Sequence, residues 1–392
     1  MEFSFKVINE KLVIYLRDRI DSNNAKEVQD SILLIVNNNP HSSLELDANN
    51  LEFISSAGLR VILFFAKLEK SLQIVNVSSS VYEVFEMTGF TSMIDILKKF
   101  RTISIDGCEV IGQGANGTVY KISDDTIVKV YKYEDALPDI ENERKLARKA
   151  FMLGVPTAIP YDIVKVNDKY GSVFELLNAK MLTSIFMDED SDFDKYIDMS
   201  AKVLKSIHEI TLPPNELPLI KSKVMKRVKY LEGRIPNEVY NKVYKMVEEI
   251  PEDNTVLHGD YHIKNIMLQN DELLLIDMDT FSQGNIIFEF ANMYTGYIGF
   301  GETDPDNIEK FLGIPITTAA VIFYETLYKY FGTRNRAFID SIWKKCALLS
   351  AIRLYKRMDT QEDPTLHAQA EHFKQRIIYL AKHVDELYIK GE

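Results

Sequence analysis

The chain has 392 residues, a formal net charge of -12, a hydrophobic fraction of 46% and two cysteines. This acidic balance excludes a general binder of nucleic-acid backbones, and two scattered cysteines exclude a disulfide framework or a cysteine-rich metal site. The sequence has no apolar run of the roughly 20 residues that span a membrane, and its start lacks the layout of a signal peptide. We therefore expect a cytoplasmic protein of two or three domains, with neither a nucleic acid nor a membrane as partner.

Residues 1–100 alternate short apolar strands with amphipathic helices. The first helix is expected to run through about Asn37, with Asp21 or Ser22 as its cap. Further strands and helices follow up to about residue 87. This order predicts an α/β sandwich with one helical layer, which would form a first domain at residues 1–100.

The segment Leu51–Leu63, LEFISSAGLRVIL, resembles the signature of the STAS domain of bacterial anti-sigma factor antagonists. In that family a partner kinase phosphorylates a serine in the loop before the second helix. The resemblance therefore implies a module for regulation or for docking a protein partner. The usual acceptor position falls on Ala57, which has no hydroxyl. Ser55 and Ser56 precede it, and both can instead cap the helix that follows.

A glycine-rich segment, CEVIGQGANGTVY, follows the first domain. It places Gly112, Gly114 and Gly117 in the spacing GxGxxG, with Asn116 inside the loop. A Rossmann dinucleotide loop shares this spacing but opens a helix, whereas here β-forming residues and then a turn follow. The context predicts a strand–loop–strand hairpin that covers the phosphates of a nucleotide.

Lys129 stands among apolar residues in the next predicted strand, where its charge needs a partner. The following helix, Asp139–Leu153, offers Glu141 and Glu143. Glu143 lies three residues before Leu146 on the buried face, so we predict that it pairs with Lys129. In kinases such a lysine joins the α- and β-phosphates of the nucleotide to a helix glutamate.

The segment Glu175–Leu177 lies where a β-rich small lobe, residues 105–177, would pass into a helical large lobe, residues 178–392. Backbone groups of such a connection can bind the edge of an adenine. Glu175 and Leu177 are therefore candidate nucleotide-binding residues.

Residues 256–279, VLHGDYHIKNIML followed by LLLIDMD, are the most informative part of the sequence. They predict two strands with polar residues in and after the loop between them: His258, Asp260, Asn265, Asp277 and Asp279. Carboxylates gathered in this way repel one another unless a cation offsets their charge, and hard oxygen ligands suit Mg²⁺. Phosphoryl transfer from a nucleotide needs an Asp near the attacking hydroxyl, with an Asn and another Asp on Mg²⁺.

The whole order of motifs resembles the aminoglycoside phosphotransferase and choline kinase family, which has a bilobal protein-kinase-like fold. The resemblance implies ATP, with GTP not distinguished from it, and Mg²⁺ as cofactors. It implies that Asp260 orients or deprotonates the acceptor hydroxyl, while Asn265 and Asp277 bind Mg²⁺. His258 would brace the loop, and Asp279 would be a second metal ligand or a loop support.

Three features of the large lobe have alternative interpretations. Glu289 replaces the Asp that usually begins a helix in the resembling family, and we expect it to brace the catalytic loop. Lys264 can neutralise the transferred phosphate or simply be solvated. The aromatic residues after about residue 292 are expected to be mainly core. Acids in the same region could attract an amine on the acceptor: Glu302, Asp304 and Asp306.

The sequence as a whole favours an active phosphotransferase. It would move the γ-phosphate of ATP to a hydroxyl, on a small molecule rather than a protein, with the STAS module serving regulation or partner docking. The alternative is a non-catalytic nucleotide-binding signalling or scaffold protein that acts through the STAS domain. Loss of Asp260, Asn265 or Asp277 would favour that alternative, and all three are present.

Overall fold

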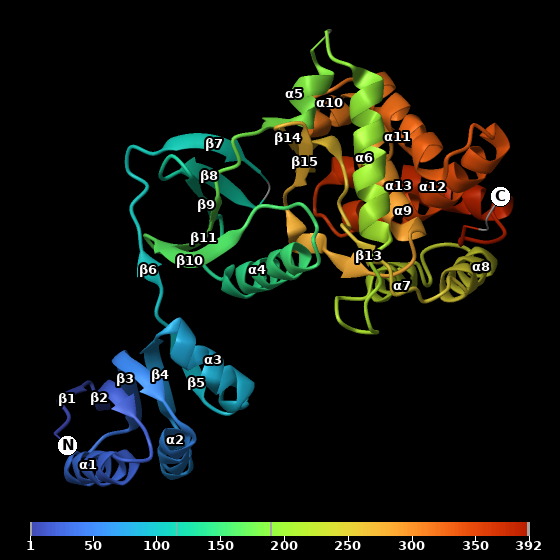
Figure 1. Ribbon diagram of the computed structural model, residues 1–392. Coiled ribbons are helices and arrows are strands. Elements are labelled where there is room, and N and C mark those ends of the chain that lie inside the picture. Colours follow the sequence, from blue (N-terminus) through green and yellow to red (C-terminus); the bar gives the residue numbers. More distant parts are fainter. Residues whose placement is uncertain (1, 115, 189, 390–392) are drawn as a thin grey trace. The chain divides into compact units, whose positions relative to one another are not determined.

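The computed structural model describes residues 2–114, 116–188 and 190–389 (Figure 1). Ala115, which belongs to the predicted glycine-rich loop, lies outside the described residues. The chain divides into two compact units, each with its own hydrophobic core. The first comprises Met1–Ser104 with Val164–Asn167, and the second comprises Ile105–Ile163 with Asp168–Glu392.

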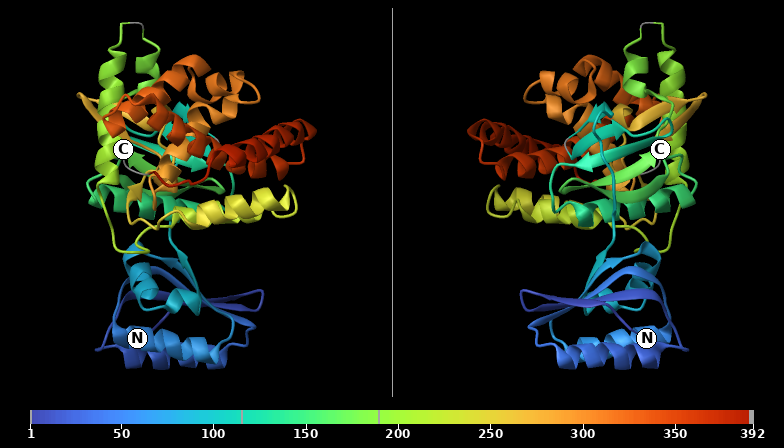
Figure 2. Two further views of the ribbon diagram at one scale, coloured as in Figure 1. Left: turned by 90° about the vertical axis from the view of Figure 1, so that its right-hand side faces the viewer. Right: turned by 90° about the vertical axis from the view of Figure 1, so that its left-hand side faces the viewer.

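A five-stranded sheet in the order β1-β2-β3-β4-β5 forms the first unit. β1 and β2 are antiparallel, and the other neighbours are parallel, so each of these later strands needs a crossover. The elements are β1 (Phe5–Ile8), β2 (Lys11–Ile20), α1 (Ala25–Asn38), β3 (Ser43–Ile54), α2 (Ser56–Leu68), β4 (Leu72–Val77), α3 (Ser79–Met87), η1 (Phe90–Ser92) and β5 (Asp95–Lys98). Figure 2 shows α1 and α2 side by side along one face of the sheet.

The start of α1 differs from the prediction that Asp21 or Ser22 caps it. The helix begins at Ala25, and Asn24 is the N-cap residue. Asp21 instead forms a side-chain turn: its Oδ1 accepts a hydrogen bond from the Asn23 amide at 2.9 Å, and its own amide donates to Asn24 Oδ1 at 2.8 Å. An Asp that bonds its own backbone two residues on competes with helix formation, and here it delays the helix.

Ser55 is the N-cap residue of α2. Its Oγ accepts hydrogen bonds from the amides of Ala57 at 3.2 Å and Gly58 at 3.4 Å. Ser56 is the first residue of the helix and is exposed. The expectation that both serines cap the helix is therefore confirmed for Ser55 and wrong for Ser56. Gly58 is required by packing, since a Cβ there would lie 2.7 Å from the carbonyl oxygen of Ile20.

A mainly antiparallel sheet begins the second unit. Its strands are β7 (Glu109–Gln113), β8 (Gly117–Lys121), β9 (Thr126–Tyr131), β10 (Pro160–Val166) and β11 (Lys169–Glu175), in the spatial order β10-β11-β9-β8-β7. The last residues of β10 belong to the first unit, where Val164 and Lys165 pair in parallel with the short strand β6 (Arg101–Thr102). Helix α4 (Leu137–Met152) connects β9 to β10. The hairpin of β7 and β8 is the strand–loop–strand unit that the sequence predicted in place of a Rossmann helix.

Helices and two small sheets make up the rest of the second unit (Figure 1). The helices are α5 (Leu182–Phe186), α6 (Phe193–His208), α7 (Ile220–Lys229), α8 (Asn237–Glu248), α9 (Ile287–Tyr297), α10 (Asp306–Leu312), α11 (Ile316–Phe331), α12 (Arg336–Asp359) and α13 (Pro364–His383), with the short η2 (Ile263–Asn265), η3 (Met278–Thr280) and η4 (Gly299–Gly301). The sheets are β12 (Lys180–Met181) with β14 (Ile266–Gln269) and β15 (Glu272–Leu275), and β13 (Val256–Leu257) with β16 (Ser282–Gln283).

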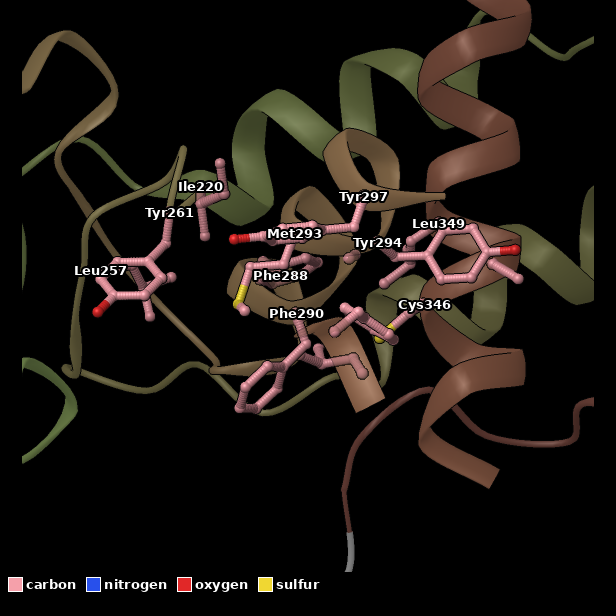
Figure 3. Close-up of a cluster of buried hydrophobic side chains, with 14 of the residues drawn as sticks. Ile220, Leu257, Tyr261, Phe288, Phe290, Met293, Tyr294, Tyr297, Cys346 and Leu349 are labelled. Atoms are coloured by element: carbon pink, nitrogen blue, oxygen red, sulfur yellow. The ribbon is translucent and has the colours of Figure 1, made fainter. Parts of the chain in front are cut away.

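Large side chains of α9 fill the core of this helical part, as the aromatic pattern predicted. Figure 3 shows them among residues from other elements, including Tyr261 of the predicted catalytic loop and Cys346 of α12. Phe290, Tyr294 and Tyr297 are almost fully buried. Burial of each such side chain contributes about 2–3 kcal/mol, so α9 is fixed firmly beside the loop that it supports.

Within the described ranges, no single helix combines the length and apolar composition of a membrane span. The bent pair α10 and α11 reaches that composition only when its two helices, 68° apart, are counted together.

Candidate active site

The HGD loop connects β13 to η2, and its backbone needs glycine at one position. Gly259 has φ +85°, and a Cβ on it would lie 2.3 Å from the carbonyl oxygen of Thr280. The Thr280 hydroxyl donates a hydrogen bond to the carbonyl oxygen of His258 at 3.0 Å. The chain thus returns from η3 to lie directly against the loop, where a larger side chain would force the two apart.

His258 supports the loop from within the core. Its ring is fully buried, and Nδ1 accepts a hydrogen bond from the Asp260 amide at 3.3 Å. Burial lowers the pKa of His258 and outweighs the nearby carboxylates, so the ring is neutral and available as an acceptor. His258 therefore acts on the loop backbone, as predicted for a brace.

One carboxylate oxygen of Asp260 is held in place and the other is left open. Oδ2 lies 3.2 Å from His262 Nε2 and accepts from Asn265 Nδ2 at 3.3 Å. Within the described part of the chain Oδ1 has no hydrogen-bond partner. Burial by itself would raise the pKa of Asp260, but the contact with His262 and the charge of Arg353 outweigh it and lower that pKa to about 2. The carboxylate is ionised at neutral pH.

Lys129 of β9 contacts both Glu143 of α4 and Asp277, which follows β15. Its Nζ lies 2.9 Å and 3.2 Å from the two carboxylate oxygens of Glu143 and 3.4 Å from Asp277 Oδ1. Burial alone would lower the pKa of Lys129, but Asp277 and Glu143 together raise it. Glu143 is buried and Glu141 is only partly so, which confirms the predicted choice of partner.

Asp277 and Asp279 concentrate negative charge at the end of β15. Asp277 adopts the left-handed conformation, with φ 65°, at the start of η3. Burial first, and then the charges of Asp277 and Glu143, raise the pKa of Asp279 to about 7. This is the electrostatic situation that a divalent cation relieves.

The donor set fits Mg²⁺. It consists of hard oxygen atoms, and the side-chain nitrogen of Asn265 already donates to the Asp260 carbonyl oxygen at 3.0 Å, which leaves the amide oxygen of Asn265 for a cation. Among the described residues there is no metal-binding group of three or more His, Cys, Asp or Glu side chains. The set proposed here is instead two carboxylates, Asp277 and Asp279, with one amide.

The glycine-rich hairpin is tightly packed on its neighbouring strand. The Gly114 amide donates to the Gly117 carbonyl oxygen at 2.9 Å, and the Asn116 carbonyl oxygen accepts from the Lys132 amide at 3.1 Å. A Cβ on Gly117 would lie 2.3 Å from the Val130 carbonyl oxygen. Gly112 lies opposite Val119 in the ladder. The glycines thus allow close approach of the loop backbone, which is also what a covered phosphate needs.

The predicted adenine-binding connection is only partly available. The Glu175 amide donates to the Ile159 carbonyl oxygen at 3.2 Å, and the Leu176 amide donates to that of Asp125 at 2.8 Å. The backbone amide and carbonyl of Leu177 form no backbone hydrogen bond within the described ranges. The backbone amide and carbonyl of Leu177 are therefore available to an adenine edge, whereas the amide of Glu175 is already bonded.

Two residues that support the loop, Asn292 and Arg353, were missed from the sequence. Helix α9 holds the loop through Glu289, whose carboxylate accepts from the Gly259 amide, and through Asn292, whose Nδ2 donates to the Gly259 carbonyl oxygen at 2.8 Å. Arg353 Nη1 in turn donates to Asn292 Oδ1 at 2.7 Å. The expected bracing role of Glu289 is confirmed. Asn292 lies three residues after Glu289 on the same helix face, a spacing that could have drawn attention to it.

Two tyrosines were also missed. The Tyr297 hydroxyl accepts a hydrogen bond from the Ile263 amide at 3.0 Å, and the Tyr131 hydroxyl donates to Glu143 Oε2. Tyr131 lies two residues after Lys129, on the same face of β9, and that spacing was the available signal.

Fold and site together define a phosphotransferase with a protein-kinase-like fold. Residues 107–313 match the phosphotransferase enzyme family, and residues 2–104 match the STAS domain. The chain belongs to the phosphotransferase enzyme family and carries an N-terminal STAS domain.

The STAS part is 31% identical over 100 residues to BtrV of Bordetella bronchiseptica, which is named as an anti-sigma factor antagonist; the match spans 24% of this chain and 85% of BtrV. Two solved structures are similar to most of the chain. The streptomycin–ATP–APH(2")-IIa ternary complex has 14% identity and a TM-score of 0.46 and covers 79% of this chain and 98% of that one. ADP-bound APH(2'')-Ib has 16% identity and a TM-score of 0.47 and covers 79% and 99%.

Proposed function

We propose that this phosphotransferase moves the γ-phosphate of ATP to a hydroxyl group of a small molecule and depends on Mg²⁺. The observation that carries the proposal is the contact of Lys129 with both Glu143 and Asp277. It brings the predicted phosphate-binding lysine to the predicted metal site. GTP is the alternative donor.

The chain's own residues would prepare the nucleotide for transfer. Glu143 fixes Lys129 so that its ammonium group can meet the α- and β-phosphates, and the glycine-rich hairpin would cover them. Mg²⁺, held by Asn265, Asp277 and Asp279, would neutralise charge on the phosphate oxygens.

Asp260 would orient the acceptor hydroxyl through its free Oδ1. A carboxylate with a pKa of about 2 is a weak base, so its main task would be to fix the direction of the hydroxyl. In a loose phosphoryl-transfer transition state the proton can leave late, and positioning supplies most of the catalysis.

The STAS domain would regulate the reaction or dock a protein partner, in a cytoplasmic setting. The name of BtrV, an anti-sigma factor antagonist, supports a protein partner. Ala57 has no hydroxyl, so control by phosphorylation would have to use a neighbouring position, of which Ser56 is the exposed one.

Nucleotide turnover by the purified chain tests this function. The assay would use Mg²⁺ with ATP or GTP and a panel of sugars, amines, nucleosides and hydroxy acids, with Asp260→Asn as the matched inactive variant. Acceptor-stimulated turnover that Asp260→Asn loses, with nucleotide affinity retained, is the expected result. Nucleotide binding with no turnover on any acceptor would instead favour the non-catalytic signalling protein.

A further inference from the structure

An arginine of α12 lies beside the HGD loop without a carboxylate partner. Arg353 is half-buried and donates to Asn292, which donates to the carbonyl oxygen of Gly259, the residue next to Asp260. Within the described ranges no Asp or Glu oxygen lies within 4.0 Å of Arg353. Burial lowers the pKa of Arg353, and the nearby carboxylates of Asp260 and Asp279 only partly oppose this effect. Oδ2 of Asp260 is itself bonded to His262 and Asn265.

A second arginine increases the positive charge at this place. Arg227 of α7 is half-buried and lines a small cavity of about 10 Å³ together with Asn292. Burial, followed by the charge of Arg353, lowers the pKa of Arg227 to about 10. Arg227 forms no ion pair within the described part of the chain. Two half-buried cations that repel each other, neither of them ion-paired within the described ranges, are in an unfavourable arrangement that a bound anion would relieve.

A series of aromatic contacts connects a third arginine, Arg357, to His262 and so to Asp260. Arg357, one turn after Arg353, lies 5.3 Å from the ring of Phe300, and Phe300 lies 5.1 Å from Phe311. The Phe311 ring is 5.0 Å from that of His262, whose Nε2 contacts Asp260. Arg357 is exposed, whereas Arg353 one turn earlier is half-buried.

Two of the three acids that could have attracted an amine are engaged elsewhere. Glu302 accepts from the Tyr294 hydroxyl at 2.7 Å and lies 3.0 Å from Arg376 Nε. Asp304 lies 3.7 Å from Lys310 and accepts from the Asp306 amide. Glu302 and Asp304 are therefore already engaged, whereas Arg353 and Arg227 form no ion pair within the described ranges.

We propose that the acceptor is an anionic hydroxyl compound whose carboxylate or phosphate binds Arg353, with Arg227 and Arg357 adding positive charge, while Asp260 holds its hydroxyl. This inference rests on the proposed function and names its substrate class. A guanidinium presents paired N–H donors that match both anions in a bidentate way. In the transfer, the acceptor oxygen bonds to the γ-phosphorus, and the bond from that phosphorus to the β,γ-bridging oxygen breaks. The hydroxyl proton passes by way of Asp260 to solvent, and ADP leaves.

A matched set of small ligands tests the charge preference. Glycerol 3-phosphate, glycerate, glycerol and 3-amino-1,2-propanediol share one carbon skeleton and differ in charge. Calorimetry would measure their binding to the full chain saturated with Mg²⁺ and ADP. At least one anion should bind tenfold or more tightly than glycerol, a difference of about 1.4 kcal/mol, and the amine should not. The two anions distinguish a phosphate from a carboxylate. Anion affinities equal to that of glycerol, or tighter binding of the amine, would overturn the inference.

Arginine variants test the assigned residues. Arg353→Gln should reduce the anion affinity about tenfold and leave ADP affinity unchanged. The exposed Arg357→Gln, which carries no risk to the core, should reduce it by a smaller factor. Arg334→Gln is the matched control, because Arg334 is exposed and paired with Glu325 at 2.7 Å. Equal anion affinity in wild type, Arg353→Gln and Arg357→Gln would overturn the assignment.

The turnover assay separates this inference from the proposed function. Turnover restricted to cationic acceptors and unaffected by Arg353→Gln would overturn the inference and keep the phosphotransferase. Arginine-dependent anion binding without turnover on any acceptor would overturn the proposed function and keep the anion site.

Discussion

The carboxylate of Glu289 accepts a hydrogen bond from the backbone amide of Gly259, with nitrogen-to-oxygen distances of 3.0 Å to Oε1 and 3.1 Å to Oε2. Glu289 is fully buried in the first turn of α9, thirty residues after Gly259. His208 Nε2 lies 3.7 Å from the same carboxylate. The position of the HGD loop is therefore set by a helix that contains none of the proposed catalytic or metal-binding residues.

Glu289→Ala should destabilise the protein and slow turnover together. The substitution leaves the buried amide of Gly259 without an acceptor, which costs about 1–3 kcal/mol of unfolding free energy. Glu289→Gln keeps one acceptor oxygen and should lose less on both measures. Denaturant unfolding and kcat would be measured for each variant. Equal behaviour of the Ala and Gln variants would show that the hydrogen bond does not matter.

Tyr131→Phe should raise the KM for ATP about threefold to tenfold with little change in kcat. The hydroxyl donates to Glu143, and burial and that carboxylate raise the pKa of Tyr131, so it stays a donor. A bond to a charged group is worth about 1.5–3 kcal/mol, and its loss would loosen Glu143 and hence Lys129. The same change in a Glu143→Gln background is the control. An effect of the same size there would exclude action through Glu143.

The low pKa of Asp260 predicts that the protein loses folding stability as the pH falls into the acid range. Its folded-state pKa, about 2, lies below the ordinary 3.8, so the ionised group stabilises the fold above pH 3.8 and this contribution is lost as the pH falls toward 2. The depression corresponds to at most about 2 kcal/mol, because the side chain is partly exposed. Unfolding free energies of wild type and Asp260→Asn between pH 5 and 3 would measure it. Parallel curves for the two proteins would contradict the prediction.

Ser55→Ala should destabilise the STAS domain by about 1 kcal/mol, whereas Ser56→Ala should change its stability little. The Ser55 hydroxyl accepts hydrogen bonds from two backbone amides at the start of α2. An N-cap serine contributes about 0.5–2 kcal/mol to the free energy of unfolding. Ser56 is exposed and caps nothing. Thermal unfolding of the two variants gives the comparison. A larger loss for Ser56→Ala would point to a contact that the helix cap does not explain.

Local patterns predicted much of this fold and site. The β-forming residues after Gly117 distinguished a hairpin from a Rossmann turn, and helical periodicity selected Glu143 over Glu141 for Lys129. These inferences depend on residues close in sequence, where periodicity of 2 or 3.6 fixes which side chains share a face.

The missing parts depend on contacts across long stretches of chain. Arg353 reaches Gly259 through Asn292, and 94 positions of sequence separate the arginine from the loop. No local period relates such residues, so only the packing of α9 and α12 brings them together. The late start of α1 has the opposite origin, because a side-chain turn at Asp21 overrode a helix pattern that was otherwise correct.

The left-handed backbone of Asp277 sets stability and chemistry against each other at one position. Glycine adopts φ 65° without strain, while an aspartate held there gives up folding free energy of the order of 1 kcal/mol. A library selected only for thermal resistance would therefore tend to exchange this residue for glycine. Such variants would fold well and be lost only when a selection for phosphoryl transfer is applied, so the two selections would rank position 277 in opposite order.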